Sequence, residues 1–369
     1  MKLTIIIGTR PEIIRLSATI KKAKQYFEVS VVHTGQNYDY ELNKVFFKDL
    51  ELDDPEYYLN CSTTNLGQTV GDVIAKSYEL FTEIKPDAIL ILGDTNSCLC
   101  AYSAKRLKIP IFHCEAGNRC YDPNVPEEIN RKIIDHLADV NMCYMEHARQ
   151  NLLAENIKPQ YTFVVGSPMT EVISNLTTKI NSSNVLKTLN LTKNKYFVWS
   201  SHREENINNM INFNKMINSI NNLALKYSLP VVFSIHPRTR KMIEQNNVVL
   251  NENIIMSKPF GVIDYCCLQQ NALCVISDSG TITEESNILN FKSVLLRTST
   301  EHPEGIDSGS ITIGNIDWIN LSASIAMCLN SDDTQLLNCY EDDNFSDKVC
   351  KIIIGYTDII NKFVWNKYQ

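Results

Sequence analysis

The sequence has no long hydrophobic segment and no excess of positive charge. No apolar run approaches the roughly 18 residues that a membrane span requires, which argues against a membrane protein. Lys and Arg number 35 and Asp and Glu 42, a formal net charge of −7, so no basic surplus exists to neutralise a nucleic-acid backbone. The first apolar run is too short for a signal peptide and predicts a buried strand, so we expect a cytoplasmic protein.

Several glycine and cysteine motifs are also missing. No G-x-G-x-x-G follows the first predicted strand and no G-x-x-x-x-G-K-[ST] occurs, which disfavours dinucleotide-binding and P-loop proteins. The absence of G-x-S-x-G disfavours an α/β-hydrolase. The cysteines include no C-x-x-C pair, and His113, Cys114 and Cys120 do not form a convincing metal set. We therefore expect free, buried thiols and no metal.

Short β-branched runs alternate regularly with longer helical patterns along the chain. Such alternation predicts parallel sheets with right-handed crossovers and helices on both faces, an α/β fold. The pattern restarts after residues 166–194, a segment rich in Asn, Ser and Thr. We expect an N-terminal domain of residues 1–168, completed by a C-terminal helix at 346–369, and a C-terminal domain of residues 169–345. The strands are predicted at 2–7, 29–33, 87–92, 109–113 and 161–165, and then at 196–200, 231–235, 254–256, 274–276 and 294–296.

Polar side chains follow six of these strands. In parallel sheets, ligands bind at the carboxyl ends of the strands, where the loops face helix N-termini. The positions concerned are Gly8-Thr9-Arg10, Gly93-Asp94-Thr95, Glu115, Ser201-His202-Arg203, His236 and Ser277-Asp278-Ser279-Gly280. Six such strand ends in two domains are hard to explain by helix capping alone, and they predict a ligand site.

Each of these positions also has a structural explanation. Asp94 could cap the following helix, His202 could belong to a solvated charge run, and His236 could be a satisfied core imidazole. Ser279-Gly280-Thr281 suits a phosphate at a helix N-terminus but is equally an ordinary N-cap. Glu115 has no evident capping role, which favours function. Acids in one domain and a phosphate-type helix start in the other suit a nucleotide-sugar enzyme.

The motifs, taken in order, resemble those of one family. They are Gly8-Thr9-Arg10-Pro11-Glu12, Gly93-Asp94-Thr95, Glu115-Ala116-Gly117, Pro126-Glu127-Glu128-Ile129-Asn130-Arg131, Ser201-His202-Arg203-Glu204-Glu205-Asn206, and Asp278-Ser279-Gly280 with Glu284-Glu285. Over nearly its whole length the chain resembles the non-hydrolysing UDP-N-acetylglucosamine 2-epimerases. The resemblance implies a GT-B fold, with two Rossmann-like parallel-sheet domains and a cleft between them.

Within that family the chain is most similar to the branch that makes UDP-N-acetyl-L-fucosamine for capsule or O-antigen synthesis. The similarity is carried by residues 10–16, 33–42, 115–120 and 277–282. That branch inverts C2 of UDP-2-acetamido-2,6-dideoxy-L-talose. Ordinary epimerases usually have Lys in place of Arg15, Leu in place of Asn118 and a longer segment before Pro126, and the wider family tends to have Arg in place of His302. UDP-N-acetylglucosamine, giving UDP-N-acetylmannosamine, is the alternative substrate.

The resemblance also implies roles for individual residues. Asp94, Glu115 and Glu127 are the implied acid/base groups, and His202 would hold or protonate the leaving diphosphate. The implied substrate-binding residues are Arg10, Arg15, Gln36, His236, Phe260, Ser279, Gly280, Glu284 and Arg297. No cofactor is implied, because no hydride leaves, and the expected assembly is a homodimer that binds a UDP-sugar.

Two other classes of protein remain open at this point. A retaining glycosyltransferase of the same fold would bind the same UDP group but pass the sugar to an acceptor. A non-catalytic nucleotide-sugar sensor would use the three acids only structurally. Incubation with the UDP-sugar and no acceptor distinguishes an epimerase from a glycosyltransferase. Exchange of the C2 hydrogen distinguishes an epimerase from a sensor.

Overall fold

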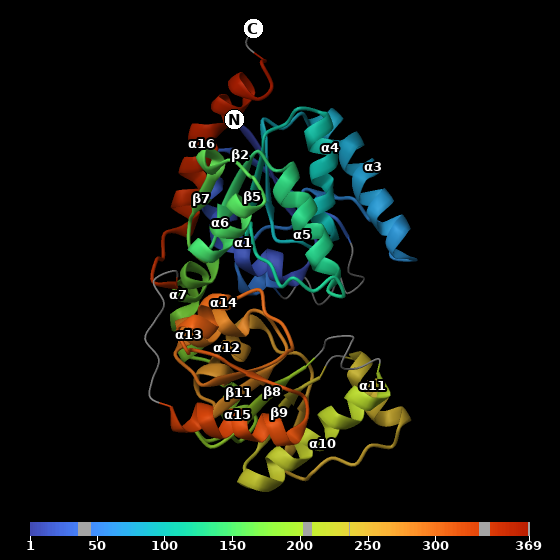
Figure 1. Cartoon of the computed structure of the whole chain (residues 1–369), viewed down its shortest axis with the longest axis vertical. Helices are drawn as coiled ribbons and strands as arrows, with labels where there is room; N and C mark the ends of the chain where they lie inside the picture. The colour runs from blue at the N-terminus through green and yellow to red at the C-terminus, as the bar shows by residue number, and fades with distance from the viewer. Residues whose placement is uncertain (36–45, 202–208, 236, 332–339, 368–369) are drawn as a thin grey trace. The chain divides into compact units, whose positions relative to one another are not determined.

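The chain of the computed structural model divides into two compact units. The structure describes residues 1–35, 46–201, 209–235, 237–331 and 340–367. One unit comprises Met1–Ser174 and Asp342–Gln369, and the other comprises Asn175–Glu341 (Figure 1). The boundaries expected from the sequence lie at residues 168/169 and 345/346.

The first unit is built on a parallel sheet of seven strands in the order β3-β2-β1-β4-β5-β6-β7. Its strands are β1 (Lys2–Ile7), β2 (Glu28–His33), β3 (Tyr57–Tyr58), β4 (Ala88–Leu92), β5 (Ile111–Cys114), β6 (Val140–Cys143) and β7 (Thr162–Val164). Its helices are α1 (Arg10–Ala23), α3 (Leu66–Ile84), η1 (Asn96–Leu99), α4 (Cys100–Arg106), α5 (Pro126–Leu137), α6 (Glu146–Ala154), η2 (Pro159–Tyr161) and α16 (Phe345–Phe363). Leu92 pairs with Cys114, so β4 and β5 end side by side.

The second unit is a parallel sheet of six strands in the order β10-β9-β8-β11-β12-β13. Its strands are β8 (Phe197–Ser200), β9 (Val231–Ser234), β10 (Ile254–Ser257), β11 (Cys274–Ser277), β12 (Ser293–Leu296) and β13 (Thr312–Gly314). Its helices are α8 (Val185–Thr188), α10 (Met210–Tyr227), α11 (Pro237–Gln245), α12 (Val262–Gln270), α13 (Ile282–Leu289), α14 (Pro303–Asp307) and α15 (Trp318–Asn330). The central strand β11 is buried along its whole length.

The central strands read as continuous apolar runs because helices cover both faces of each sheet. All five residues of β4 are buried, and their sequence is Ala-Ile-Leu-Ile-Leu. The C-terminal helix α16 packs against α1, and Ser346 at its start donates from both its backbone N–H and its hydroxyl to the Glu171 carboxylate. Two Rossmann-like parallel-sheet domains are thereby present, which confirms the predicted fold class.

The segment between the two predicted domains is helical rather than an open linker. Helix α7 (Pro168–Asn181) and α8 fill most of residues 166–194, and the division between the two units falls inside α7. Buried apolar side chains recur along α7 at helical spacing, at Val172, Ile173, Leu176 and Ile180. Burial of this apolar face outweighs the low helix propensity of the Asn and Thr residues in the segment.

Two further local features differ from the sequence prediction. Between the strands predicted at 87–92 and 109–113 the alternation predicts one helix, whereas the structure has a 3₁₀ turn, η1, followed by the short helix α4. Strand β6, which the sequence did not predict, lies between β5 and β7 and orders the segment that follows it. In the part of the chain that the structure describes, no helix has the length and apolar character needed to cross a membrane.

Candidate active site

The first turn of the first unit is held by Glu12, a residue that the sequence analysis quoted only as part of a motif. The Glu12 carboxylate accepts hydrogen bonds from the backbone N–H groups of Gly8 and Thr9 and from the Thr95 hydroxyl. Complete burial raises the pKa of Glu12 to about 7, although these three donors favour its charged form. Glu12 thus ties the turn after β1 to the turn after β4.

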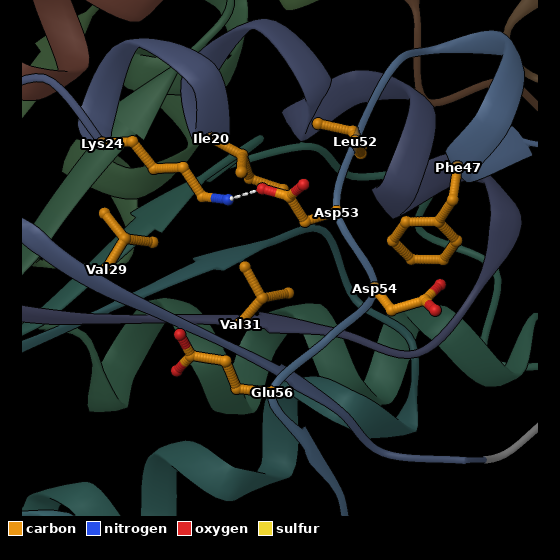
Figure 2. Close-up of a pocket in the computed structure, with 9 residues that line it drawn as sticks. All are labelled: Ile20, Lys24, Val29, Val31, Phe47, Leu52, Asp53, Asp54 and Glu56. Atoms are coloured by element: carbon orange, nitrogen blue, oxygen red, sulfur yellow. Dashed lines mark hydrogen bonds and ion pairs between the residues drawn. The ribbon is translucent and has the colours of Figure 1, made fainter.

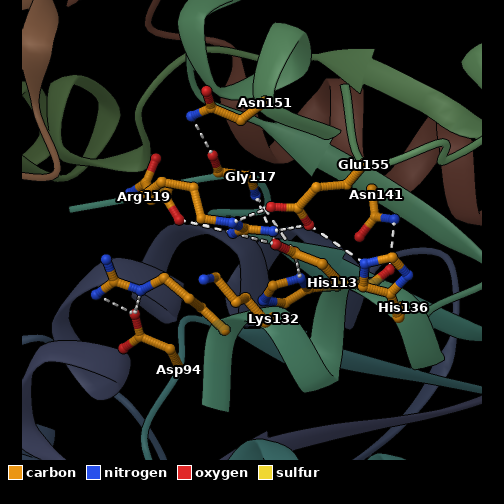
Figure 3. A network of polar contacts seen from close by, with 12 residues as sticks. Asp94, His113, Gly117, Arg119, Lys132, His136, Asn141, Asn151 and Glu155 are labelled. Atoms are coloured by element: carbon orange, nitrogen blue, oxygen red, sulfur yellow. Dashed lines mark hydrogen bonds and ion pairs between the residues drawn. The ribbon is translucent and has the colours of Figure 1, made fainter. Parts of the chain in front are cut away.

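Asp94, which follows β4, forms an ion pair with an arginine, and it is not the N-cap of the helical turn that follows. Both Nε and Nη2 of Arg131, on α5, lie 2.8 Å from Asp94 Oδ2 (Figure 3). The cap of the following 3₁₀ turn is Thr95, whose hydroxyl accepts from the Ser97 N–H at 3.3 Å. The structural explanation of Asp94 as a helix cap is therefore wrong, and its carboxylate is held at the strand end by charge pairing.

Glu115, which follows β5, occupies a backbone conformation that few L-residues adopt. Its φ is 65°, in the left-handed region, and Gly117 two residues later has a φ of 83°. Its Oε2 atom accepts from the Arg15 guanidinium and, at 3.2 Å, from the Tyr144 hydroxyl. The side chain retains 12% exposure. The two donors come from α1 and from the residue after β6, so two segments besides its own fix this carboxylate.

A network of polar contacts includes Gly117, two residues after Glu115 (Figure 3). The Asp135 carboxylate, on α5, accepts from the Gly117 N–H at 3.2 Å and from Arg119 Nη1 at 2.7 Å. Arg119 also donates from Nε and Nη2 to the two oxygens of Glu155, each at 2.7 Å. His113 Nδ1 lies 3.0 Å from Asp135. Asp135 and Arg119 are both buried and pair with each other, and they hold the turn that carries Glu115.

The two glutamates at the start of α5 are in different environments. Glu128 is buried and accepts from the N–H groups of Cys120 and Tyr121. Its neighbour Glu127 is half-buried, in the first turn of the helix. Glu128 therefore shapes the loop that precedes α5, whereas Glu127 presents a carboxylate with more exposure.

Of the two arginines of α1 predicted to bind the substrate, one is exposed and one is buried. Arg10 is exposed at the start of α1, with its guanidinium carbon 5.4 Å from the centre of the Phe46 ring. Arg15, one turn further along α1, is buried and contacts Glu115. The arrangement leaves the Arg10 head group nearer to solvent, while Arg15 binds one of the acid/base candidates.

A pocket of the first unit lies away from these residues. Figure 2 shows its lining, in which Lys24, directly after α1, donates to Asp53 at 2.5 Å. The lining residues are Ile20, Lys24, Val29, Val31, Phe47, Leu52, Asp53, Asp54 and Glu56. It includes none of the predicted site residues and no residue that follows the end of a strand, so we do not assign the site to it.

In the second unit, the residues after β11 form a compact turn before α13. The Ser279 N–H donates to the Ser277 hydroxyl at 3.1 Å, and the Ser279 hydroxyl lies 3.0 Å from that of Thr281. A Cβ at Gly280 would lie 2.6 Å from a Glu301 oxygen, so only glycine fits there without displacing that side chain. The exposed backbone N–H groups at such a helix start favour an anion.

Of three other predicted binding residues of this unit, Arg297 and Glu284 lie close to the same turn, and Phe260 follows β10. Arg297 is buried, donates to the Asp278 carbonyl at 3.0 Å and pairs with Glu301. Glu284 is fully buried in the first turn of α13. Phe260 is half-buried in the segment between β10 and α12.

His302 is a buried charged group beside this turn. Burial opposes the protonation of His302. The negative charges of Glu304, Glu284 and Glu301 favour it and outweigh the effect of burial. The Oε1 atom of Glu304 lies 2.9 Å from His302 Nδ1. The pKa of His302 is raised to about 9. At neutral pH this imidazolium therefore offsets part of the negative charge of the surrounding carboxylates.

This pairing predicts a loss of stability at alkaline pH. His302 has a folded-state pKa of about 9 against 6.5 unfolded, so its stabilisation is complete below pH 6.5 and is lost as the pH rises through 9. We expect the free energy of unfolding to fall by about 3 kcal/mol over this range, and His302→Gln to remove most of that dependence. Urea titrations at a series of pH values measure this free energy, and the fluorescence of Trp199 and Trp318 reports on unfolding of this unit. An equal dependence of the unfolding free energy on pH in the wild-type protein and in His302→Gln would contradict the prediction.

Three predicted residues, Gln36, His202 and His236, lie outside the residues that the structure describes. Among those it does describe, no group of three or more His, Cys, Asp or Glu side chains is arranged to hold a metal ion.

Comparison with known proteins relates the whole chain to one group of enzymes. A UDP-N-acetylglucosamine 2-epimerase of Methanococcus maripaludis is 35% identical over 364 residues, covering 96% of this chain and 98% of that protein. The UDP-N-acetylglucosamine 2-epimerase structure from Rickettsia bellii superposes with a TM-score of 0.92 at 41% identity, covering 99% of each chain. The UDP-GlcNAc 2-epimerase structure from Methanocaldococcus jannaschii, solved in complex with UDP-GlcNAc and UDP, superposes with a TM-score of 0.90 at 32% identity. This match covers 96% of this chain and 100% of that one.

Two Rossmann-like parallel-sheet domains with polar groups at the carboxyl ends of their strands define a GT-B-type enzyme. Residues 19–354 match the family model described as UDP-N-acetylglucosamine 2-epimerase. The chain belongs to the non-hydrolysing UDP-N-acetylglucosamine 2-epimerase family, and it is an isomerase. The predicted family and enzyme class are confirmed.

Proposed function

We propose that the chain inverts C2 of a UDP-2-acetamido sugar by eliminating and re-adding UDP. The observation that carries this proposal is the Glu115 carboxylate, held at a strand end by Arg15 and Tyr144. The backbone at Glu115 is in a sparsely populated conformation, and such strain is typical of functional positions. Family membership supports the reaction type, since the relatives above are named as 2-epimerases.

The reaction needs a carboxylate because the C2 hydrogen of the sugar is not acidic by itself. The bond between C1 and the diphosphate oxygen breaks first, and UDP leaves with the electron pair. The oxocarbenium character at C1 acidifies the C2–H bond. A carboxylate removes that proton, and the C–H electrons form a C1=C2 double bond, which gives a 2-acetamidoglycal. Asp94, Glu115 and Glu127 are the proposed acid/base groups.

Re-addition completes the inversion. A carboxylic acid on the opposite face delivers a proton to C2, and the diphosphate oxygen bonds again to C1. We propose that His202 and Arg10 hold the diphosphate while it is detached, and that Ser279 and Gly280 donate to it from the start of α13. The other proposed binding residues are Arg15, Gln36, His236, Phe260, Glu284 for the ribose hydroxyls, and Arg297.

We propose UDP-2-acetamido-2,6-dideoxy-L-talose as the substrate and UDP-N-acetyl-L-fucosamine as the product, for capsule or O-antigen synthesis. A 6-deoxy sugar presents a methyl group where an ordinary hexose presents a hydroxyl. The loop at 118–125 suits a methyl through Cys120 and Val125, which are both half-buried. The Cys120 thiol itself donates to Glu128 at 3.3 Å, so it offers no free donor to a sugar hydroxyl.

Turnover in D₂O tests the reaction. Proton NMR should show deuterium at C2 of the product and, with time, at C2 of the recovered substrate, because the abstracted proton exchanges with solvent. An incubation without enzyme is the control, and no acceptor is added, so a glycosyltransferase gives no epimer. Retention of protium at C2 through many turnovers would rule out proton abstraction.

The same assay tests the substrate. A buried polar group without a partner costs about 1–3 kcal/mol, so a site built for a methyl should disfavour a 6-hydroxyl about 5- to 150-fold in kcat/KM on that contact alone. We therefore expect UDP-2-acetamido-2,6-dideoxy-L-talose to be preferred over UDP-N-acetylglucosamine. Equal or faster turnover of UDP-N-acetylglucosamine would reject this substrate and leave the epimerase reaction standing.

We also propose that the chain forms a homodimer through its first unit. Helices α3, α4 and α5 are neighbours in that unit and carry large exposed apolar side chains. These are Tyr78, Tyr102, Ile129 and Ile133. Covering such side chains on adjacent helices is a common reason for association.

A further inference from the structure

The two oxygens of the Glu115 carboxylate have different surroundings. Oε2 accepts from both the Arg15 guanidinium and the Tyr144 hydroxyl. Among the described residues, no donor contacts Oε1. One oxygen is therefore anchored by two donors, while the other keeps its lone pairs available.

Tyr144 is well placed to act as a fixed anchor. It directly follows β6 and is completely buried. Its ring packs edge-on against Phe345 of α16, with centroids 6.1 Å apart, and the Arg15 guanidinium carbon lies 5.7 Å from its ring centre. The ring thus has little freedom, and its hydroxyl stays directed at Glu115.

We propose that Tyr144 is a positioning residue that orients Glu115 so that Oε1 takes up the C2 proton of the sugar. This inference rests on the epimerase function proposed above. With Oε2 held by Tyr144 and Arg15, the carboxylate cannot rotate to exchange its two oxygens without losing both hydrogen bonds. When Oε1 takes the C2 proton, Oε2 becomes the carbonyl oxygen of the neutral acid and still accepts from the Tyr144 hydroxyl. The hydroxyl keeps its proton throughout.

Tyr144→Phe removes the hydroxyl but keeps the ring that Arg15 and Phe345 contact. We expect kcat to fall about 10- to 100-fold, as for the loss of a hydrogen bond to a charged group, with KM within about twofold. UDP affinity measured by calorimetry should not change. The primary isotope effect with C2-deuterated substrate should rise, because proton removal becomes slower than the other steps.

The matched control is Tyr196→Phe in the second unit. Tyr196 is also completely buried, and its hydroxyl donates to the Leu268 carbonyl at 2.6 Å. Its variant loses a comparable buried hydrogen bond and should keep the wild-type kcat and isotope effect. A second variant with 3-fluorotyrosine at position 144 keeps the hydroxyl and should recover most of the rate. Failure of 3-fluorotyrosine to recover it would overturn the proposal.

A double-mutant cycle tests whether Tyr144 acts through Glu115. In the Glu115→Gln background, Tyr144→Phe should reduce the residual rate no further. Additive losses, or a wild-type kcat for Tyr144→Phe alone, would overturn the positioning role. If instead the wild-type protein epimerises neither UDP-2-acetamido-2,6-dideoxy-L-talose nor UDP-N-acetylglucosamine, the proposed function itself fails, which separates the two outcomes.

Discussion

Glu115→Gln should lower the rate of epimerisation about 10²- to 10⁴-fold, the usual contribution of a general acid or base, and should slow C2 exchange in D₂O to the same extent. Glutamine keeps an oxygen that can accept from Arg15 and Tyr144, so the fold and the affinity for UDP should persist. The amide cannot take up the sugar proton. NMR rates together with calorimetry of UDP binding measure the two effects separately.

Two further variants serve as comparisons for this prediction. Glu146→Gln alters a glutamate that is also paired with an arginine, Arg149, but on the exposed surface of α6, and it should leave the rate unchanged. Ser279→Ala, at the turn before α13, should mainly weaken UDP binding. A Glu115→Gln enzyme that keeps its rate but loses UDP affinity would show that Glu115 binds substrate and transfers no proton.

Gly117→Ala should destabilise the first unit by about 2–5 kcal/mol. The φ of 83° costs an alanine about 1–2 kcal/mol. In addition, the new Cβ would lie 2.2 Å from the Ala148 carbonyl oxygen, a backbone atom at the start of α6, and such overpacking adds about 1–3 kcal/mol. Because Gly117 is two residues from Glu115, we also expect the rate to fall. Guanidinium unfolding followed by circular dichroism measures the loss of stability.

Gly309→Ala isolates the conformational part of that cost. Gly309 has a φ of 71°, but a Cβ there meets nothing within 4 Å. Its variant should lose only about 1–2 kcal/mol. Equal losses for the two variants would mean that the contact with Ala148 relaxes freely and that the turn is not tightly packed.

Sequence reasoning proposed candidate site residues from their places at strand ends, because ligands of parallel sheets bind there. Asp94 and Glu115 are predicted from their positions after apolar runs, and the structure places Glu115 directly after the buried strand β5 and Asp94 two residues after the buried strand β4. Tyr144 was not identified, since β6 was not predicted and a tyrosine in an apolar segment looks like an ordinary core residue. The sequence Val-Asn-Met-Cys-Tyr-Met at 140–145, bounded by Asp139 and Glu146, was the signal available for that strand.

The helical structure of residues 168–181 also depends on packing. Composition at 166–194 is dominated by Asn, Ser and Thr, which have weak helix propensity, yet Val172 and Leu176 face the interior and make α7 helical. Propensity is a local quantity, whereas the burial that decides the outcome depends on which elements pack against the segment.

The alternation of apolar runs by itself determined two parallel-sheet domains, because strand and helix periodicities are properties of neighbouring residues. Ordered motifs determined the family. The partners of the carboxylates were decided only by the tertiary structure: Arg131 for Asp94, and Arg15 with Tyr144 for Glu115, come from elements distant in the sequence. No local pattern records such pairings, since the order of strands in the sheet, and not the order of residues in the chain, brings these groups together.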